Sequence, residues 1–203
     1  MLKNPYPGKF IVFEGPDGSG QTTQSSLLEK YIFGLGKKVV LTKEPTLDSK
    51  AGLEVKDILN HEKESTPEDL QKLFAEDRKE HLEKLIIPAL KEGSAVISDR
   101  YFFSTFAFGS LGADLEWLIS INEDFILPDI TFVLTVKPET SIERIASRGI
   151  KSTLFEKLES LKKVMENYKN LANRFENMVF IDGDRPIEEI HKEIAERALS
   201  ILK

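Results

Sequence analysis

The sequence has no cysteine among its 203 residues, which excludes disulfide bonds and thiolate metal sites. Its three histidines, His61, His81 and His191, lie far apart without metal-ligand spacing, and we expect each to be a surface or interface residue. No apolar run approaches the roughly 20 residues of a membrane span. The first ten residues, MLKNPYPGKF, lack the long apolar stretch of a secretion signal. We therefore expect a cytoplasmic protein without membrane contact.

Excess positive charge is also missing. The formal net charge is −6, which argues against a general nucleic-acid-binding protein but is compatible with a local basic site for a nucleotide. Hydrophobic residues make up 40% and charged residues 31% of the chain, which is ordinary for a globular protein. The length fits a single domain over residues 1–203 that can bury a sizeable core.

Short apolar runs alternate along the chain with segments of helical periodicity. The runs predict strands over residues 10–14, 38–42, 95–98, 130–136 and 178–181. The intervening patterns predict helices over residues 21–34, 50–60, 67–92, 101–110, 114–122, 139–148, 153–175 and 186–202. Strands separated by helices predict an α/β fold of three layers, with a five-stranded parallel sheet flanked by helices on both faces. Thr66 before Pro67 is typical of a helix start.

Residues 13–24 read FEGPDGSGQTTQ, and they follow a predicted strand and open a predicted helix. The pattern G-x-x-x-x-G-K-[ST] fits Gly15, Gly20 and Thr22. Glycines let the backbone turn its N–H groups toward an anion, and the helix N-terminus adds partial positive charge. The alternative is a glycine-rich turn before an ordinary helix. We expect this loop to bind phosphate, with the Thr22 hydroxyl placed to contact Mg²⁺.

The lysine position of this pattern holds Gln21, which donates hydrogen bonds but carries no charge. A missing charge contact near a surface cleft costs on the order of 4 kcal/mol before compensation. Two interpretations follow: other cations replace the lysine, or the chain binds nucleotide and turns it over slowly.

Polar residues follow the predicted strands, where ligands of open α/β sheets bind. Asp99 and Arg100 come after the third strand, and such a pair can hold a magnesium-bound water and clamp a phosphate. The alternative is a surface pair that caps the next helix. Phe74 and Arg78 share one helix face, where they could stack on a base and grip a phosphate. Taken alone, they fit a core phenylalanine and a solvated arginine better.

Together, these segments resemble thymidylate kinases, which are P-loop nucleoside monophosphate kinases that phosphorylate dTMP with ATP. The resemblance spans nearly the whole chain and follows the order of the family. It rests on the segments FEGPDGSGQTTQ, TKEP, LFAEDRKEH and SDRYFFSTFAF, with looser matches in LPDITFVLTVKPETSIERIASRG and IDGDRPIEEI. The phosphate loop is shared by many proteins, whereas DRY-x-x-S-x-x-A-F with LFA-x-x-R upstream is much more specific.

The resemblance implies a role for each matching position. It implies that ATP is bound by Gly15, Asp17, Gly18, Ser19, Gly20, Gln21, Thr22, Thr23, Arg144, Arg148 and Asp182. It implies that dTMP is bound by Asp17, Lys43, Phe74, Arg78, Arg100, Ser104 and Phe108. Asp17 would bind the sugar hydroxyl, Phe74 would stack on thymine, and Arg100 would hold the acceptor phosphate.

The resemblance also implies the catalytic apparatus and the partners. Phosphoryl transfer would depend on Asp99, Arg100, Gln21, Arg148 and Lys151, with Mg²⁺ as cofactor at Thr22 and Asp99. Residues from about 148 to 157 would form a short mobile lid that excludes water. ATP and dTMP are the expected ligands, nucleic acid is not expected as a partner, and the family implies a homodimer.

Some positions depart from the family pattern, mostly in the phosphate-transfer half. Gly18 follows Asp17 where some members carry an arginine, and Lys43 stands where an arginine is usual. Gly109 follows Ala-Phe where a polar side chain is frequent. Lys151 is the only basic residue in segment 149–156, so it is our candidate, with Arg144 and Arg148, for replacing the loop lysine.

Two alternatives to a thymidylate kinase remain open from the sequence. One is a kinase for another nucleoside monophosphate or for a deoxynucleoside, because the sequence does not rank bases. The other is a non-catalytic nucleotide-binding protein derived from the kinase fold. Gln21 favours the second alternative, whereas the presence of Thr22, Asp99 and Arg100 argues against it.

Overall fold

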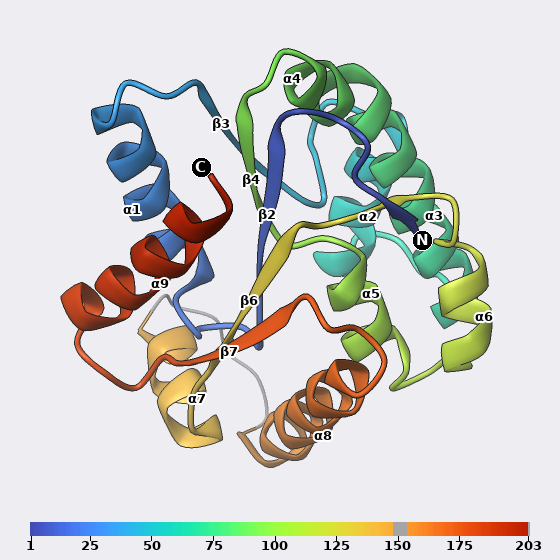
Figure 1. Cartoon of the computed structure of the whole chain (residues 1–203). Coiled ribbons are helices and arrows are strands. Elements are labelled where there is room, and N and C mark those ends of the chain that lie inside the picture. The colour runs from blue at the N-terminus through green and yellow to red at the C-terminus, as the bar shows by residue number, and fades with distance from the viewer. Residues whose placement is uncertain (148–153, 203) are drawn as a thin grey trace.

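Five parallel strands form the central sheet of the computed structural model, which describes residues 1–147 and 154–202 (Figure 1). The strand order is β3-β4-β2-β6-β7. The strands are β2 (Lys9–Glu14), β3 (Val39–Lys43), β4 (Ala95–Asp99), β6 (Ile130–Thr135) and β7 (Met178–Asp182). All five predicted strands are confirmed to within one residue at either end. A separate two-stranded parallel sheet of β1 (Leu2–Lys3) and β5 (Ile126–Leu127) was not predicted.

Helices cover both faces of the sheet, as the near-continuous apolar strands predict. They are α1 (Gln21–Gly34), α2 (Lys50–Leu59), α3 (Pro67–His81), α4 (Ile87–Lys91), α5 (Phe102–Gly109), α6 (Leu115–Ser120), α7 (Pro138–Ala146), α8 (Leu154–Ala172) and α9 (Ile187–Ile201). Figure 1 shows α1 and α9 on one side of the sheet and α3, α4, α5 and α8 on the other. The predicted three-layer arrangement is therefore confirmed.

Each strand divides its side chains between two hydrophobic cores. In β2, Phe10 and Val12 join a core with α4, α5 and α8, while Ile11 and Phe13 join a core with α1 and α9. This division follows from the strand period of two, because successive side chains point to opposite faces. Both cores are buried, so the sheet is held rigidly and its polar residues are left at the strand ends.

The helix predicted over residues 67–92 is interrupted. A π-helical segment, η1 (Leu82–Ile86), lies between α3 and α4, and Pro88 is in the first turn of α4. Proline has no N–H to donate to the carbonyl four residues earlier, and π segments absorb such local mismatches. Within the described residues, no helix is both long enough and apolar enough to cross a membrane.

Helix α3 begins where Thr66 and Pro67 predict a helix start, and this end of the helix provides a test of local stability. The Thr66 hydroxyl accepts a hydrogen bond from the Asp69 N–H at 3.1 Å, and Pro67 occupies the first turn. We expect Thr66→Ala to lower the free energy of unfolding by about 1 kcal/mol, because the helix loses its cap. Urea denaturation measures this change. Ser65→Ala, which alters the neighbouring exposed hydroxyl, is the control, and an equal loss in both variants contradicts the capping role.

Candidate active site

The phosphate loop, residues 15–20, leaves the end of β2 and enters α1. Gly15, Gly18 and Gly20 have φ values of 141°, 80° and 103°, which place them in the region that favours glycine. The hydroxyl of Ser19 is buried and has no hydrogen-bond partner in the part of the chain that the structure describes. The first turn of α1 contains no acidic residue and has no side-chain cap. This arrangement fits a phosphate, because the loop offers unpaired donors beside the positive end of a helix.

Gly18 packs tightly against the helix that precedes the expected lid. A Cβ at Gly18 would lie 2.9 Å from the carbonyl oxygen of Ser141 in α7. The Ser141 hydroxyl also donates to the carbonyl of Asp17 at 2.5 Å. The loop therefore has no room for a side chain at position 18, so an arginine cannot be accommodated there in this loop conformation.

Gln21 is built into the loop rather than exposed at its mouth. Its side chain is 6% exposed, and its amide nitrogen donates to the carbonyl oxygen of Gly15 at 2.9 Å. Its amide oxygen accepts a long hydrogen bond of 3.3 Å from the Nη2 group of Arg100. Gln21 therefore contacts both the loop backbone and the guanidinium of Arg100.

The Arg100 guanidinium joins the phosphate loop to α5. Its Nη1 group donates to the Gly15 carbonyl at 3.0 Å and to the Ser104 hydroxyl at 2.9 Å. Its Nη2 group forms an ion pair with Asp17 at 2.6 Å. Burial alone would lower the pKa of Arg100, but the Asp17 carboxylate is the main group that raises it, and the net pKa lies above the usual value. Arg100 is therefore charged at all physiological pH values.

The backbone of Arg100 is strained in a way that aims this side chain. Its φ is 77°, which is uncommon for a residue with a Cβ. The Arg100 N–H donates to the carbonyl of Phe13 at 2.9 Å, and its carbonyl accepts from the Ser98 hydroxyl at 2.7 Å. Such outliers persist where surrounding contacts determine them, and they concentrate at functional sites.

Thr22 and Asp99 lie together, as the sequence predicts for a magnesium site. The Thr22 hydroxyl donates to the Asp99 carboxylate at 2.6 Å. No group of three or more histidine or acidic side chains that could hold a metal is present in the described residues. One carboxylate and one hydroxyl suit Mg²⁺, which keeps several waters and completes its shell with substrate phosphates. Asp99 does not cap α5, so the alternative of a surface capping pair is wrong.

A buried carboxylate that the sequence did not single out lies beneath the loop. Glu14 accepts hydrogen bonds from the N–H groups of Tyr101 and Ser104 and from the hydroxyls of Ser104 and Tyr168. Burial raises the pKa of Glu14 to about 7, although the hydrogen bond from Ser104 and the charge of Arg100 oppose the shift. Burial likewise raises the pKa of Tyr168 well above its usual value, so Tyr168 is a neutral donor. Glu14 thus joins β2, α5 and α8.

A cavity of about 380 Å³ opens beside Arg100 between α3, α5 and the segment after β3. Every residue expected to bind dTMP lines it, namely Asp17, Lys43, Phe74, Arg78, Arg100, Ser104 and Phe108. A larger hollow of about 700 Å³ lies between α2 and the α3–η1 region, but no residue of the phosphate loop lines it. The smaller cavity is the better site because it combines an aromatic wall with cations that reach the loop.

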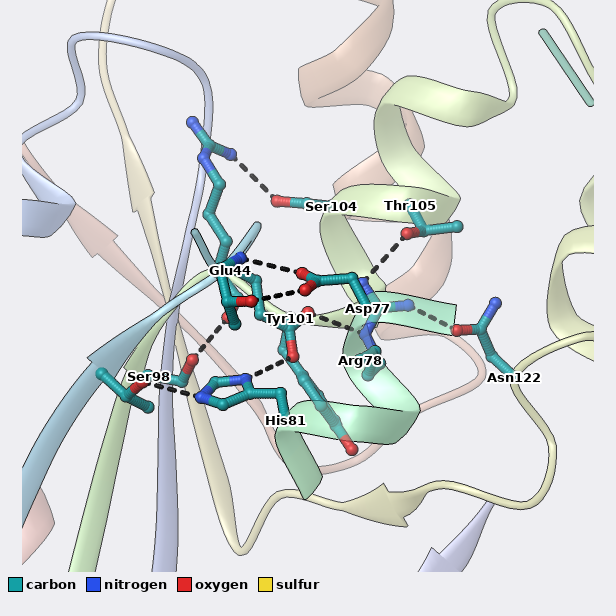
Figure 2. A network of polar contacts seen from close by, with 12 residues as sticks. Glu44, Asp77, Arg78, His81, Ser98, Tyr101, Ser104, Thr105 and Asn122 are labelled. Carbon is teal, nitrogen blue, oxygen red and sulfur yellow. Dashed lines mark hydrogen bonds and ion pairs between the residues drawn. The ribbon is translucent and has the colours of Figure 1, made fainter. Parts of the chain in front are cut away.

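Arg78 is buried within this cavity wall, with a side chain only 2% exposed, so the alternative of a solvated arginine is wrong. Figure 2 shows Arg78 directed from α3 toward Thr105 and Asn122. Its Nε group donates to Glu44 at 2.8 Å, its Nη1 group to Asn122 at 2.5 Å and its Nη2 group to Thr105 at 3.2 Å. Three fixed partners hold the guanidinium in one orientation.

His81 completes this network, which corrects the expectation that it is a surface or interface residue. It is buried, and its two ring nitrogens contact Glu44 at 3.1 Å and the Thr42 hydroxyl at 2.7 Å (Figure 2). The helical position of His81, one turn after Arg78, was the available signal. A buried Glu44 explains the burial, because its carboxylate needs hydrogen-bond donors on both oxygens.

The residues expected around ATP gather on the other side of the loop. The Arg144 guanidinium donates to the carbonyls of Gly18 and Gly183, both at 3.2 Å. Gly183 also lies against the loop, because a Cβ there would be 3.0 Å from the carbonyl oxygen of Ser19. Asp182 borders an open hollow of about 580 Å³ beyond the ends of β6 and β7. Arg148, Lys151 and most of the predicted lid lie outside the described residues.

Sequence reasoning missed several polar residues of the site. These are Glu14, Glu44, Gln71, Thr105, Asn122 and Tyr168. Glu14 and Glu44 each end or follow a strand, a position that would have identified them. Asn122 and Tyr168 carry no such signal, because only the packing of helices distant in sequence brings them to Arg78 and Glu14.

Comparison with known proteins agrees with this geometry. A family model described as thymidylate kinase matches residues 13–194. A probable thymidylate kinase of Thermococcus onnurineus is 44% identical over 201 residues, covering 91% of this chain and 94% of the relative. One of Thermococcus kodakarensis is 41% identical over 200 residues, with the same coverage. A thymidylate kinase of Desulfotalea psychrophila is 35% identical over 199 residues, covering 97% of each chain.

The buried Glu14 carboxyl predicts a specific dependence of stability on pH. Its pKa is raised from 4.5 to about 7, so between these values the folded state holds a proton that the unfolded state releases. The stabilisation from this group is full below about pH 4.5 and is lost as pH rises through about 7, by roughly 3 kcal/mol. We expect Glu14→Gln to remove this loss, because glutamine does not titrate.

Urea denaturation of both proteins at pH 5.0 and pH 8.0 measures the effect. Between pH 5.0 and pH 8.0, the free energy of unfolding of Glu14→Gln should rise relative to that of the unmutated chain. The exposed substitution Glu62→Gln serves as the control. Parallel pH profiles for the unmutated chain and Glu14→Gln would show that Glu14 is ionised in the folded protein.

Proposed function

Because the chain belongs to the thymidylate kinase family, we propose that it transfers the γ-phosphoryl group of ATP to dTMP, giving dTDP and ADP for dTTP synthesis. Family membership makes it a phosphotransferase of nucleoside monophosphates. One observation supports the choice of dTMP as the phosphoryl acceptor. All seven residues expected at dTMP line one cavity, and one of them, Arg100, also contacts the phosphate loop.

In this proposal, the donor and acceptor phosphates meet at Arg100. An oxygen of the acceptor phosphate forms a bond to the γ-phosphorus, the bond from that phosphorus to the β–γ bridging oxygen breaks, and ADP leaves. The attacking oxygen is already anionic, so the reaction needs cations and alignment more than a strong base. The Arg100 contacts with Gly15 and Ser104 support a bridging role, because they span the two sites.

The proposed contacts of Mg²⁺ and of ATP rest on the same arrangement of residues around the phosphate loop. ATP-dependent transfer in this family is usually accompanied by Mg²⁺, which would neutralise charge on the phosphates. Thr22 and Asp99 are the proposed metal contacts, and Arg144 and Asp182 the proposed neighbours of ATP. Arg148 and Lys151 are proposed to close over the phosphates as part of a lid. A homodimer and a cytoplasmic location stay predictions.

The fixed orientation of Arg78 favours bases with a carbonyl at position 4. Three of its nitrogens donate to protein acceptors, and an arginine has five N–H groups, so Nη1 and Nη2 each keep one donor among the described contacts. The 4-carbonyl of thymine or uracil can accept from such a donor, whereas the 4-amino group of cytosine opposes it.

A coupled assay of ADP release with ATP, Mg²⁺ and dTMP, dUMP, dCMP or dGMP tests the function. We expect turnover of dTMP, and we expect kcat/KM for dCMP to be about a hundredfold lower, because mismatched polar groups would be left unpaired. Faster turnover of another monophosphate would reassign the substrate. Nucleotide binding without ADP release above background would favour the non-catalytic alternative that Gln21 suggests.

The loop glutamine provides a second test. Among the described residues, a backbone carbonyl and a long contact to Arg100 hold the side chain of Gln21, and a lysine amine could still donate to the carbonyl. We expect Gln21→Lys to raise kcat by about tenfold or more, because a full charge near the phosphates outweighs the lost contact. Steady-state kinetics measure this, with the uncharged Gln21→Met as the control. A lower kcat in Gln21→Lys would show that Arg100 depends on the glutamine.

A further inference from the structure

Gln71 is a buried amide in the wall of the acceptor cavity to which no role has been given. Its side chain is 7% exposed and lines the cavity together with Phe74 and Arg78. The amide oxygen is buried and has no hydrogen-bond partner among the residues that the structure describes. Buried polar atoms are nearly always paired, so an orphaned amide in a ligand cavity indicates a group that a ligand satisfies.

Gly109 of α5 makes the position of Gln71 possible. A Cβ at Gly109 would lie 3.1 Å from the Cδ atom of Gln71 and 3.2 Å from its amide oxygen. Both distances are too short for the two side chains to coexist without movement. The absence of a side chain at Gly109 therefore gives Gln71 its present space, at a position where the family frequently carries a polar side chain.

The spacing along α3 places this amide beside the expected base. Residues 71, 74 and 78 are related by three and by four positions, so they form one stripe on the helix. A base stacked on Phe74 therefore lies between Gln71, one turn before, and Arg78, one turn after. Arg78 can donate only, whereas an amide offers both a donor and an acceptor.

We propose that the Gln71 amide hydrogen-bonds the imide edge of the acceptor base, with its oxygen accepting from the N3–H group. Rotation of the terminal amide brings either its oxygen or its nitrogen toward the cavity, so the same group can also donate to the adjacent carbonyl. In this chain, α3 then supplies the polar side chain that α5 lacks at Gly109. The inference rests on the proposed function, because it assumes that a pyrimidine monophosphate occupies the cavity.

Substitution by leucine separates base recognition from packing. Gln71→Leu keeps the approximate size of the side chain but removes the amide. We expect the KM for dTMP to rise about tenfold, the loss typical of one neutral hydrogen bond, with kcat and the KM for ATP within about twofold. Glu76→Leu places the same leucine on the exposed part of α3 and is the matched control, which should leave all three constants unchanged.

Placing the amide at position 109 instead of position 71 tests whether its hydrogen-bonding chemistry is what matters. It also keeps the inference testable if Gln71→Leu folds poorly. Gln71→Ala should raise the KM for dTMP, and adding Gly109→Gln to it should restore most of the affinity, because the truncation removes the Gln71 atoms beside the new Cβ and leaves the flexible end of Leu118, at 3.1 Å, as the close neighbour that must shift. Thermal denaturation followed by circular dichroism confirms that each protein is folded. Recovery of stability without recovery of the KM would show a packing role and overturn the inference.

The outcomes also separate this inference from the proposed function. If the unmutated chain does not phosphorylate dTMP, the proposed function fails. If it does, and folded Gln71→Leu has an unchanged KM for dTMP, only the inference fails. A loss in kcat with an unchanged KM would likewise overturn it, since a contact with the base acts in binding.

Discussion

The site depends on one cation that is held by two structural elements at once. Arg100 follows strand β4 with a left-handed backbone, and its guanidinium contacts Gly15 of the phosphate loop and Ser104 of α5. Under the proposed function, the donor and acceptor sites would share a charged group whose position is already fixed by protein contacts, which is the condition for electrostatic catalysis with little reorganisation. With glutamine in the lysine position of the loop, Arg100 and Arg144 are fixed positive charges among the described residues that contact the loop backbone.

Buried carboxyl groups hold the remaining walls in place. Glu44 pairs with Arg78 and His81, and Glu14 accepts hydrogen bonds from α5 and α8. A buried ion pair is not by itself a source of stability, because desolvation of both charges offsets their attraction. These contacts instead give orientation. A guanidinium with three partners is held in one orientation, and under the proposed function its remaining N–H groups would favour a carbonyl over an amino group on the base.

The fold was largely predictable because its signals are local. Apolar runs of four to seven residues mark the buried strands, and the loop, the Thr66 cap and the periodic helices set the connections. Exceptions have local causes as well: Pro88 accompanies the π-helical segment, and the two-residue strands β1 and β5 are too short to carry a pattern. Most candidate site residues were also found from the sequence, since they lie just after strand ends or within motif segments. His81 was misassigned because its burial depends on Glu44, which is distant along the chain.

The sequence by itself determined the class of fold, the phosphate loop, the family, and the residues that gather at the carboxyl edge of the sheet. Tertiary structure decided how those residues are paired. It tied Gln21 to Arg100, oriented Arg78 through Glu44 and Asn122, and raised the pKa of Glu14 by burying it under two helices. It also set Gln71 opposite Gly109. The physical reason is that motifs and periodicity report neighbours along the chain, whereas burial, hydrogen-bond partners and cavity shape are properties of segments that meet only after the chain has folded.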